Sequence, residues 1–124
     1  MAYSQTLNMV VGDTLPELTV TLKDKNTAAS GQTLDSDNSD TWAPINLTGS
    51  TIRLRIREVG GSTITDTRTM SITDATNGKA ATAFTSSSFP SAGTYEGEIE
   101  MTTSGGGIQT IYDLVKFKVR DDFD

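Results

Sequence analysis

Strict alternation of apolar and polar residues is the feature of this sequence that most limits its fold. It runs through residues 51–58 and 94–102. In the first segment Ile52, Leu54 and Ile56 alternate with Arg53, Arg55 and Arg57; in the second Tyr95, Gly97, Ile99 and Met101 alternate with Glu96, Glu98 and Glu100. A period of two residues is that of a β-strand with one buried and one solvated face. Both segments are therefore predicted to be strands that pack one face on a core.

Shorter runs of β-branched and apolar residues, separated by turn residues, predict further strands. They cover residues 17–22, 45–47, 67–72, 79–84, 108–112 and 115–119, with a short edge segment at 9–11. Asn77-Gly78 is expected to supply the positive φ angles of a turn at 74–78, and a slip in the alternation near Asp113-Leu114 predicts a bulge. No apolar pattern predicts a helix longer than a turn or two. The sequence thus predicts an all-β fold: a single immunoglobulin-like β-sandwich of about seven antiparallel strands with Greek-key connections.

Two segments of the chain fall outside this strand pattern. The 124 residues fit one domain, residues 1–124. Within it, residues 1–11 are expected to form an N-terminal arm, and residues 23–44 a long polar loop rich in Asp, Ser, Asn and Thr. An unstructured loop of this length is either functional or mobile. Trp42 and Pro44, near its end, are expected to tie it to the sandwich.

Three rows of charged residues predict the strand order of one sheet. The arginines of 51–58, the glutamates of 94–102, and a third row of Lys116, Lys118 and Arg120 occupy outward-facing positions. Opposite charges on neighbouring strands attract by about 0.2–1 kcal/mol per pair, and like charges repel. The acidic strand is therefore expected between the two basic ones, with Glu98 beside an arginine of 53–57 and a lysine of 116–118. A solvated charged face is the simpler interpretation of these rows, and a charged docking surface is the functional alternative.

The composition argues against several classes of function. A net charge of −6 argues against nucleic-acid binding, which needs clustered Lys and Arg. The chain has no His and no Cys, so it lacks the usual neutral-pH base, thiolate nucleophiles and disulfides. We expect no enzyme and no catalytic residues. No apolar run approaches the length of a membrane span, and the first residues do not have the pattern of a signal peptide. We therefore expect the chain to be made in a cytoplasm and to have no contact with a membrane.

Two local patterns raise the question of a ligand. Residues 35–40 begin like a calcium loop, but Asp40 stands where the template needs Gly, and Asn46 where it needs Glu. No metal and no cofactor is therefore expected. Trp42 is a candidate platform for a sugar ring, although anchoring of the long loop is the favoured interpretation.

Four stretches carry a resemblance to a known family. They are Val11–Leu18 (VGDTLPEL), Pro44–Leu54 (PINLTGSTIRL), Asp74–Lys79 (DATNGK) and Ala92–Glu98 (AGTYEGE). In this order they resemble the immunoglobulin-like N-terminal domain of phage upper-baseplate proteins and related small virion proteins. The resemblance implies a β-sandwich that attaches or oligomerises within a phage tail or baseplate. Residues 23–44 are longer than the short turn usual there, and no fused receptor-binding or fibre region is expected after the sandwich.

The expected function is therefore that of a non-enzymatic bacteriophage virion structural protein, a tail, baseplate or neck subunit located in the virion. Its expected partners are other virion proteins, in a symmetric homo-oligomer. A capsid decoration (cement or head-fibre) protein is the alternative of the same class. A carbohydrate-binding module, with Trp42, Tyr112 and Tyr3 as candidate aromatics, and a surface-adhesion module are alternatives of another class.

Contact with partners is expected at the arm and at the polar loop. The arm offers side chains suited to adding a strand to a neighbouring sheet edge. The loop offers few apolar side chains, and ordering it costs entropy that a neighbour would offset. The candidate interface residues are Tyr3, Leu7, Met9, Val10, Leu34 and Trp42.

Overall fold

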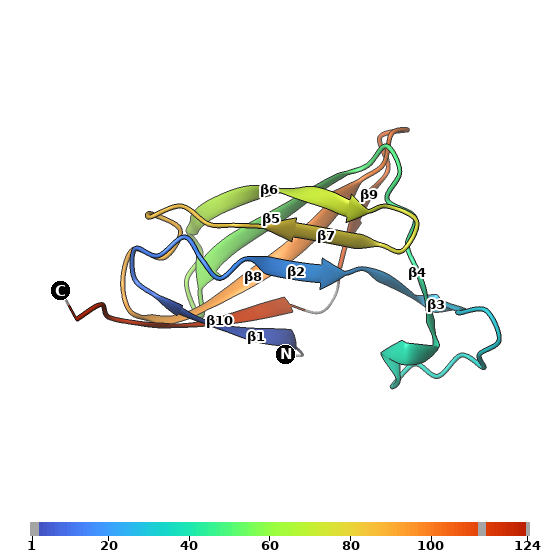
Figure 1. The fold of residues 1–124 in the computed structure, drawn as a ribbon, viewed down its shortest axis with the longest axis horizontal. Helices are drawn as coiled ribbons and strands as arrows, with labels where there is room; N and C mark the ends of the chain where they lie inside the picture. Colours follow the sequence, from blue (N-terminus) through green and yellow to red (C-terminus); the bar gives the residue numbers. More distant parts are fainter. Residues whose placement is uncertain (1–2, 112–113, 124) are drawn as a thin grey trace.

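The computed structural model describes residues 3–111 and 114–123 of the chain. These residues contain ten strands and one short 3-10 helix (Figure 1). The strands are β1 (Tyr3–Val10), β2 (Leu18–Thr21), β3 (Lys23–Ala28), β4 (Trp42–Pro44), β5 (Thr51–Glu58), β6 (Ile64–Asp74), β7 (Lys79–Thr82), β8 (Gly93–Thr102), β9 (Ile108–Thr110) and β10 (Leu114–Arg120), and the helix is η1 (Ser39–Thr41).

The strand order is that of an immunoglobulin-like β-sandwich. Seven strands follow one path, β1-β10-β8-β5-β6-β7-β2. The long β6 pairs with β5 through residues 64–70 and with β7 through residues 71–74, so it belongs to both layers. β1, β10, β8 and β5 form one layer with the first part of β6, and β7 and β2 form the other with its last part. The chain therefore changes layer from β1 to β2, from β2 to β5 and from β7 to β8, as Greek-key connections require. The predicted fold class is confirmed, except that β1 pairs with β10 in parallel.

A tyrosine near the start of β8 adds a second mark of this fold. The Tyr95 hydroxyl donates a hydrogen bond to the carbonyl oxygen of Ser91, four residues upstream, at 2.8 Å. This is the arrangement of the tyrosine corner in immunoglobulin-like sandwiches. The Tyr95 ring is fully buried and packs edge-to-face on Phe89, with the ring centroids 5.2 Å apart.

The core is built from the alternating residues of β5 and β8. Ile52, Leu54 and Ile56 have no exposed surface. They pack with the rings of the aromatic cluster Phe84, Phe89, Tyr95 and Phe117. Gly97 makes this packing possible, because a Cβ there would lie 2.7 Å from Leu54 Cδ1 and 3.0 Å from Phe117 Cε2. The inward face predicted from the alternation is confirmed.

Several predicted element boundaries were wrong. Residues 45–47 form no strand; Ile45 N–H donates to Leu22 O (2.9 Å) and Leu47 N–H to Ala75 O (2.8 Å), which holds them against two different segments. β6 is longer than 67–72, and β7 ends at Thr82. Of the Asn77-Gly78 pair only Gly78 has a positive φ, +73°, and a side chain there would collide with the Leu22 carbonyl oxygen. The chain between β9 and β10, where a bulge was expected, includes residues outside the described ranges.

The N-terminal arm is a strand of the sandwich itself. β1 pairs with β10 from Tyr3 opposite Leu114 to Val10 opposite Arg120. Met9 is 3% exposed and belongs to the core cluster, and Leu7 packs against it. The expectation of a free arm is therefore wrong, because its alternating apolar residues are already buried on the chain's own sheet.

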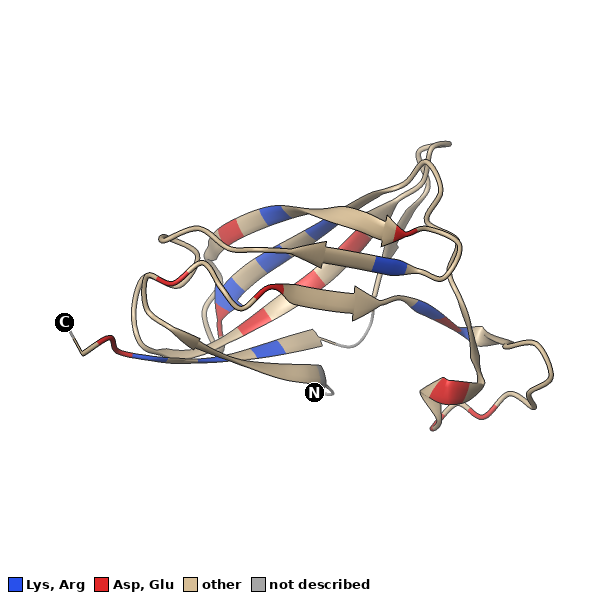
Figure 2. Cartoon of the chain, in the orientation of Figure 1, with Lys and Arg blue, Asp and Glu red and all other residues tan. Residues whose placement is uncertain are grey.

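The three charged rows lie in the predicted order (Figure 2). β8 is between β10 and β5, with Arg55 opposite Glu98 and Arg57 opposite Glu96. One detail was wrong: Lys116 is opposite Glu96 and Lys118 opposite Thr94, so no lysine of β10 faces Glu98. The described β8–β10 ladder ends at Gly97, one residue before Glu98.

Residues 23–44 form the ribbon: two antiparallel strands, β3 and β4, connected by residues 29–38, which belong to no strand or helix, and by η1. Lys23 pairs with Pro44 and Asp24 with Ala43. The ribbon projects from one end of the sandwich (Figure 1). The irregular polar loop expected for residues 23–44 is confined to residues 29–38; the paired strands beside it were missed because they lack apolar alternation and pair through the backbone.

Candidate protein-binding surfaces

The residues proposed as an interface from the sequence do not share one surface. The side chain of Tyr3 lies outside what the structure describes, Met9 is in the core, and Leu7 and Val10 are half-buried on β1. Leu34 (41% exposed) lies in the segment between β3 and η1, and Trp42 is half-buried at the start of β4. The structure therefore places Leu34 and Trp42 on the ribbon and the arm residues on the chain's own sheet.

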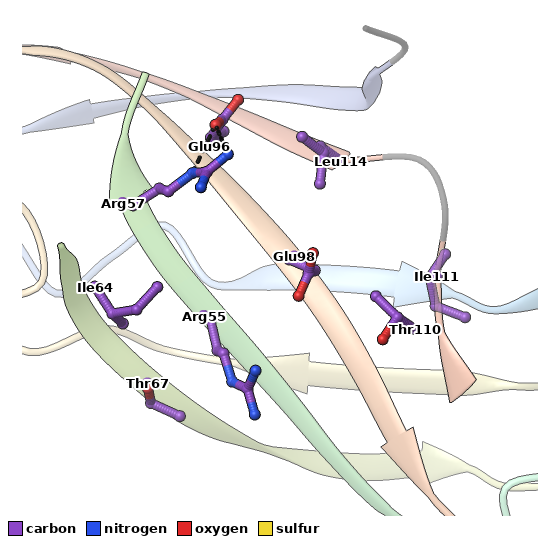
Figure 3. A pocket seen from close by; sticks show the side chains of 9 residues that line it. All are labelled: Arg55, Arg57, Ile64, Thr67, Glu96, Glu98, Thr110, Ile111 and Leu114. Atoms are coloured by element: carbon purple, nitrogen blue, oxygen red, sulfur yellow. Dashed lines mark hydrogen bonds and ion pairs between the residues drawn. The ribbon is translucent and has the colours of Figure 1, made fainter. Parts of the chain in front are cut away.

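A groove of about 620 Å³ crosses the outer face of the β10-β8-β5-β6 layer (Figure 3). Its floor carries the charged side chains Arg55, Arg57, Glu96 and Glu98. Its walls are mainly apolar, with Ile64 on β6 and, across the groove, Ile111 and Leu114. The alternation identified the floor, whereas the walls come from separate segments that the sequence does not place together.

Ion pairs use part of the charge on this floor. Arg57 Nε donates to Glu96 Oε1 at 2.8 Å, and Arg55 Nη2 lies 3.3 Å from Glu100 Oε2. The Glu96 side chain is only 7% exposed, while Arg57 retains 42% of its exposure. A buried carboxylate needs such a partner, because an uncompensated charge is costly to remove from water. The pair with Arg57 therefore compensates the buried charge of Glu96.

A second groove, of about 360 Å³, separates β9 from the ribbon. β3 contributes residues 23–26, β4 contributes Trp42, and the opposite wall is formed by residues 109–111. The Lys25 amino group lies 5.5 Å from the centroid of the Trp42 ring, within reach of a cation–π interaction. The groove thus combines an aromatic ring, two lysines and a sheet edge. No sequence pattern predicts this groove, because its two walls are more than 60 residues apart in the chain.

Hydrogen bonds within residues 35–42 order the end of the ribbon. Trp42 Nε1 donates to Asp35 O at 2.9 Å, and Thr41 Oγ1 donates to Asn38 O at 2.7 Å. Trp42 was expected to tie this segment to the sandwich. Its indole N–H instead ties the segment to the ribbon, so the anchor lies within the projection itself.

The calcium-like residues 35–40 use their side chains on their own backbone. Asp35 Oδ1 accepts from the N–H of Asp37 (3.0 Å), and Asn38 Oδ1 accepts from the N–H of Asp40 (3.1 Å). No group of three or more acidic, His or Cys side chains is arranged to hold a metal ion within residues 3–111 and 114–123. Over the same residues, no helix is long and apolar enough to cross a membrane.

Asp24 fixes the irregular part of β3. Its carboxylate accepts from the N–H of Asn26 (2.9 Å) and from the Thr27 hydroxyl (2.8 Å). The Asn26 bond first, and then the Thr27 bond, hold the pKa of Asp24 below its usual 3.8, because both favour the charged form. The β3–β4 register shifts between Asp24 and Ala28, where these bonds replace the regular ladder.

A polar cluster inside the sandwich was also missed from the sequence. Ser88, with no exposed surface, donates to Asp66 Oδ2 and accepts from the N–H of Thr85. Thr65 Oγ1 donates to Ser88 O at 3.1 Å. These bonds fasten the segment after β7 to β6. A serine buried this completely has no access to a substrate, so the cluster is structural.

No family model matches the chain, and no curated protein matches it. Among solved structures it is similar to murine CRIg, with 9% sequence identity, a TM-score of 0.39, and coverage of 93% of this chain and 92% of the other.

Proposed function

We propose that this chain is a non-enzymatic bacteriophage virion structural protein, a tail, baseplate or neck subunit that binds other virion proteins. The observation that carries the binding role is the β3–β4 ribbon. It is ordered and projects from the sandwich (Figure 1), yet from Lys25 to Asp40 every residue except the half-buried Ala29 is exposed. Ordering so many residues costs conformational entropy and here buries almost no apolar surface. Docking on a neighbour supplies the missing burial.

The virion assignment rests on the four sequence stretches that resemble phage baseplate domains. Two of them occupy structurally demanding positions. Asp74–Lys79 holds Gly78, which alone fits against the Leu22 carbonyl, and Ala92–Glu98 holds the corner tyrosine Tyr95 and the buried Gly97. A capsid decoration protein would use the same sandwich and ribbon, and differs only in where the subunit sits in the particle.

The carbohydrate-binding alternative is weaker on the observed geometry. A sugar platform needs an open aromatic face. Trp42 is half-buried, and the Lys25 amino group lies over its ring at 5.5 Å. The side chains of Tyr3 and Tyr112 lie outside what the structure describes.

Replacing the ribbon tests the proposal. Asp24 and Ala43 are paired across it, so residues 25–42 can be exchanged for an Asn-Gly turn that closes the same two strands. We expect both the parent and the variant to melt cooperatively, and we expect the variant to be missing from particles purified from cells in which the phage genome encodes it. Mass spectrometry and immunogold labelling of those particles measure incorporation. Absence of the parent chain from the particles would contradict the virion role, and normal incorporation of the variant would contradict the role of the ribbon.

A further inference from the structure

The outer edge of β9 is an open sheet edge. β9 and β10 both pair with the same side of β8, β10 with residues 93–97 and β9 with residues 100–102. β1 covers the outer edge of β10 and begins opposite Leu114. No strand in the described part of the chain pairs with the outer edge of β9.

The hydrogen-bond pattern shows which backbone groups this edge presents. Thr103 N–H donates to Gly107 O, and Ile111 N–H donates to Ile99 O, each at 2.8 Å. In an antiparallel ladder every second residue bonds to the partner strand. Residues 107, 109 and 111 therefore face β8, and Ile108 and Thr110 turn their N–H and C=O groups outward, on the side away from β8.

The groove beside this edge suits a short acidic segment with one aromatic side chain. Lys23 and Lys25 line it, against the single carboxylate of Asp24, whose oxygens already accept hydrogen bonds from Asn26 and Thr27. Trp42 and Ile111 provide apolar surface. Ile108, at the start of the edge strand, is 69% exposed.

The chain carries a segment of this chemistry at its other end. Asp121, Asp122 and Phe123 follow β10 and belong to no strand or helix. The Phe123 ring is 96% exposed, and the Arg120 guanidinium lies 5.2 Å from its centroid. This segment and the ribbon lie at opposite ends of the long axis (Figure 1), so the segment reaches the groove of another copy more readily than its own.

We propose that Asp121–Phe123 of one copy adds as a short strand to the β9 edge of a second copy, with its carboxylates near Lys23 and Lys25 and Phe123 against Ile111 and the part of Trp42 that lines the groove. Such a contact is head-to-tail, and it generates a ring or a filament according to the rotation between copies. The inference deepens the proposed function, since it names the contact that would link copies in the particle. A strand of three residues gives a weak contact that many copies reinforce.

Sedimentation velocity of the full chain over a range of concentrations tests the contact. Trp42 is the sole tryptophan, so its emission reports occupation of the groove in the same samples. We expect mass to increase with concentration together with a shift in Trp42 emission. Thr110→Pro should weaken association by about tenfold or more, because it removes an outward N–H while leaving the ladder to β8 intact. Phe123→Ala should weaken it comparably.

Charge reversal identifies the partner surface. Lys23→Glu with Lys25→Glu, and separately Asp121→Lys with Asp122→Lys, should each weaken association, and a mixture of the two variants should restore it. A chain that is monomeric at all concentrations overturns the inference. Association that is unaffected by Thr110→Pro and by both charge reversals also overturns it, and so does a β9 edge that binds only a different virion protein. If the chain is present in particles but monomeric in solution, the proposed function stands and this inference fails; if it associates but is missing from particles, the reverse holds.

Discussion

The β5–β8 strand pair and the β3–β4 ribbon are both antiparallel pairs, and they are stabilised by different means. Every second residue of β5 is fully buried, and the other face carries the ion pairs Arg57–Glu96 and Arg55–Glu100. The ribbon has no core; its strands are held by backbone pairing, by Asp24, and by the hydrogen bond from Trp42 to Asp35. The first pair is stable because of what it packs against. The second is ordered locally, which leaves its surface available to a partner.

Deleting the same side-chain atoms in each region should give the largest difference. Leu54→Ala shortens a fully buried side chain that packs against Gly97. We expect it to lower the free energy of unfolding by about 2–5 kcal/mol. Leu34→Ala, in the exposed end of the ribbon, is the matched control and should change it by less than about 0.5 kcal/mol. Urea denaturation followed by circular dichroism measures both. Equal losses would show that the ribbon and the sandwich form one cooperative core.

The ion pairs on the charged face should show a smaller effect of the same kind. Arg57→Ala leaves the Glu96 carboxylate, 7% exposed, without this partner, and we expect a loss of about 1–2 kcal/mol, reduced from that of a fully buried pair because Arg57 is half-exposed. Arg53→Ala, on the same strand and face but exposed, should stay within about 0.5 kcal/mol. Equal effects of the two substitutions would mean that the Arg57–Glu96 pair contributes no more to the free energy of unfolding than an exposed arginine does.

The same contrast explains what the sequence could predict. A strand with one face on a core has apolar residues at every second position. That alternation predicted β5, β8 and the order of the charged rows. The ribbon carries no such period, so nothing in the sequence distinguishes its strands from a loop. β1 was underestimated for another reason: its parallel pairing with β10 joins the two ends of the chain, and no local signal marks it. The grooves lie between distant segments, so only the charged floor of the larger one was accessible from sequence.

The smallest expected effect concerns the carboxylate that organises the ribbon. The hydrogen bonds from Asn26 and Thr27 lower the pKa of Asp24 in the folded ribbon below its usual 3.8, so the opened ribbon binds a proton more readily. The contribution of Asp24 to ribbon order is therefore complete above pH values near 3.8 and is lost as the pH falls through the lower folded value. The chemical shift of the Asn26 amide proton, followed by NMR, should titrate with a midpoint below 3.8.

Matched variants separate this local titration from acid unfolding of the whole chain. Asp24→Asn should abolish the titration of the Asn26 amide. Asp74→Asn alters a second carboxylate, whose pKa is lowered mainly by the Asn77 side chain in the turn after β6, and it should leave the Asn26 titration unchanged. A midpoint at or above 3.8 would mean that Asp24 is not held as described. If the Asn26 amide titrates at the same pH at which the NMR signals of the sandwich are lost, the ribbon has no order that is independent of the sandwich. The contrast between a strand pair stabilised by a core and one stabilised by local hydrogen bonds would then be wrong.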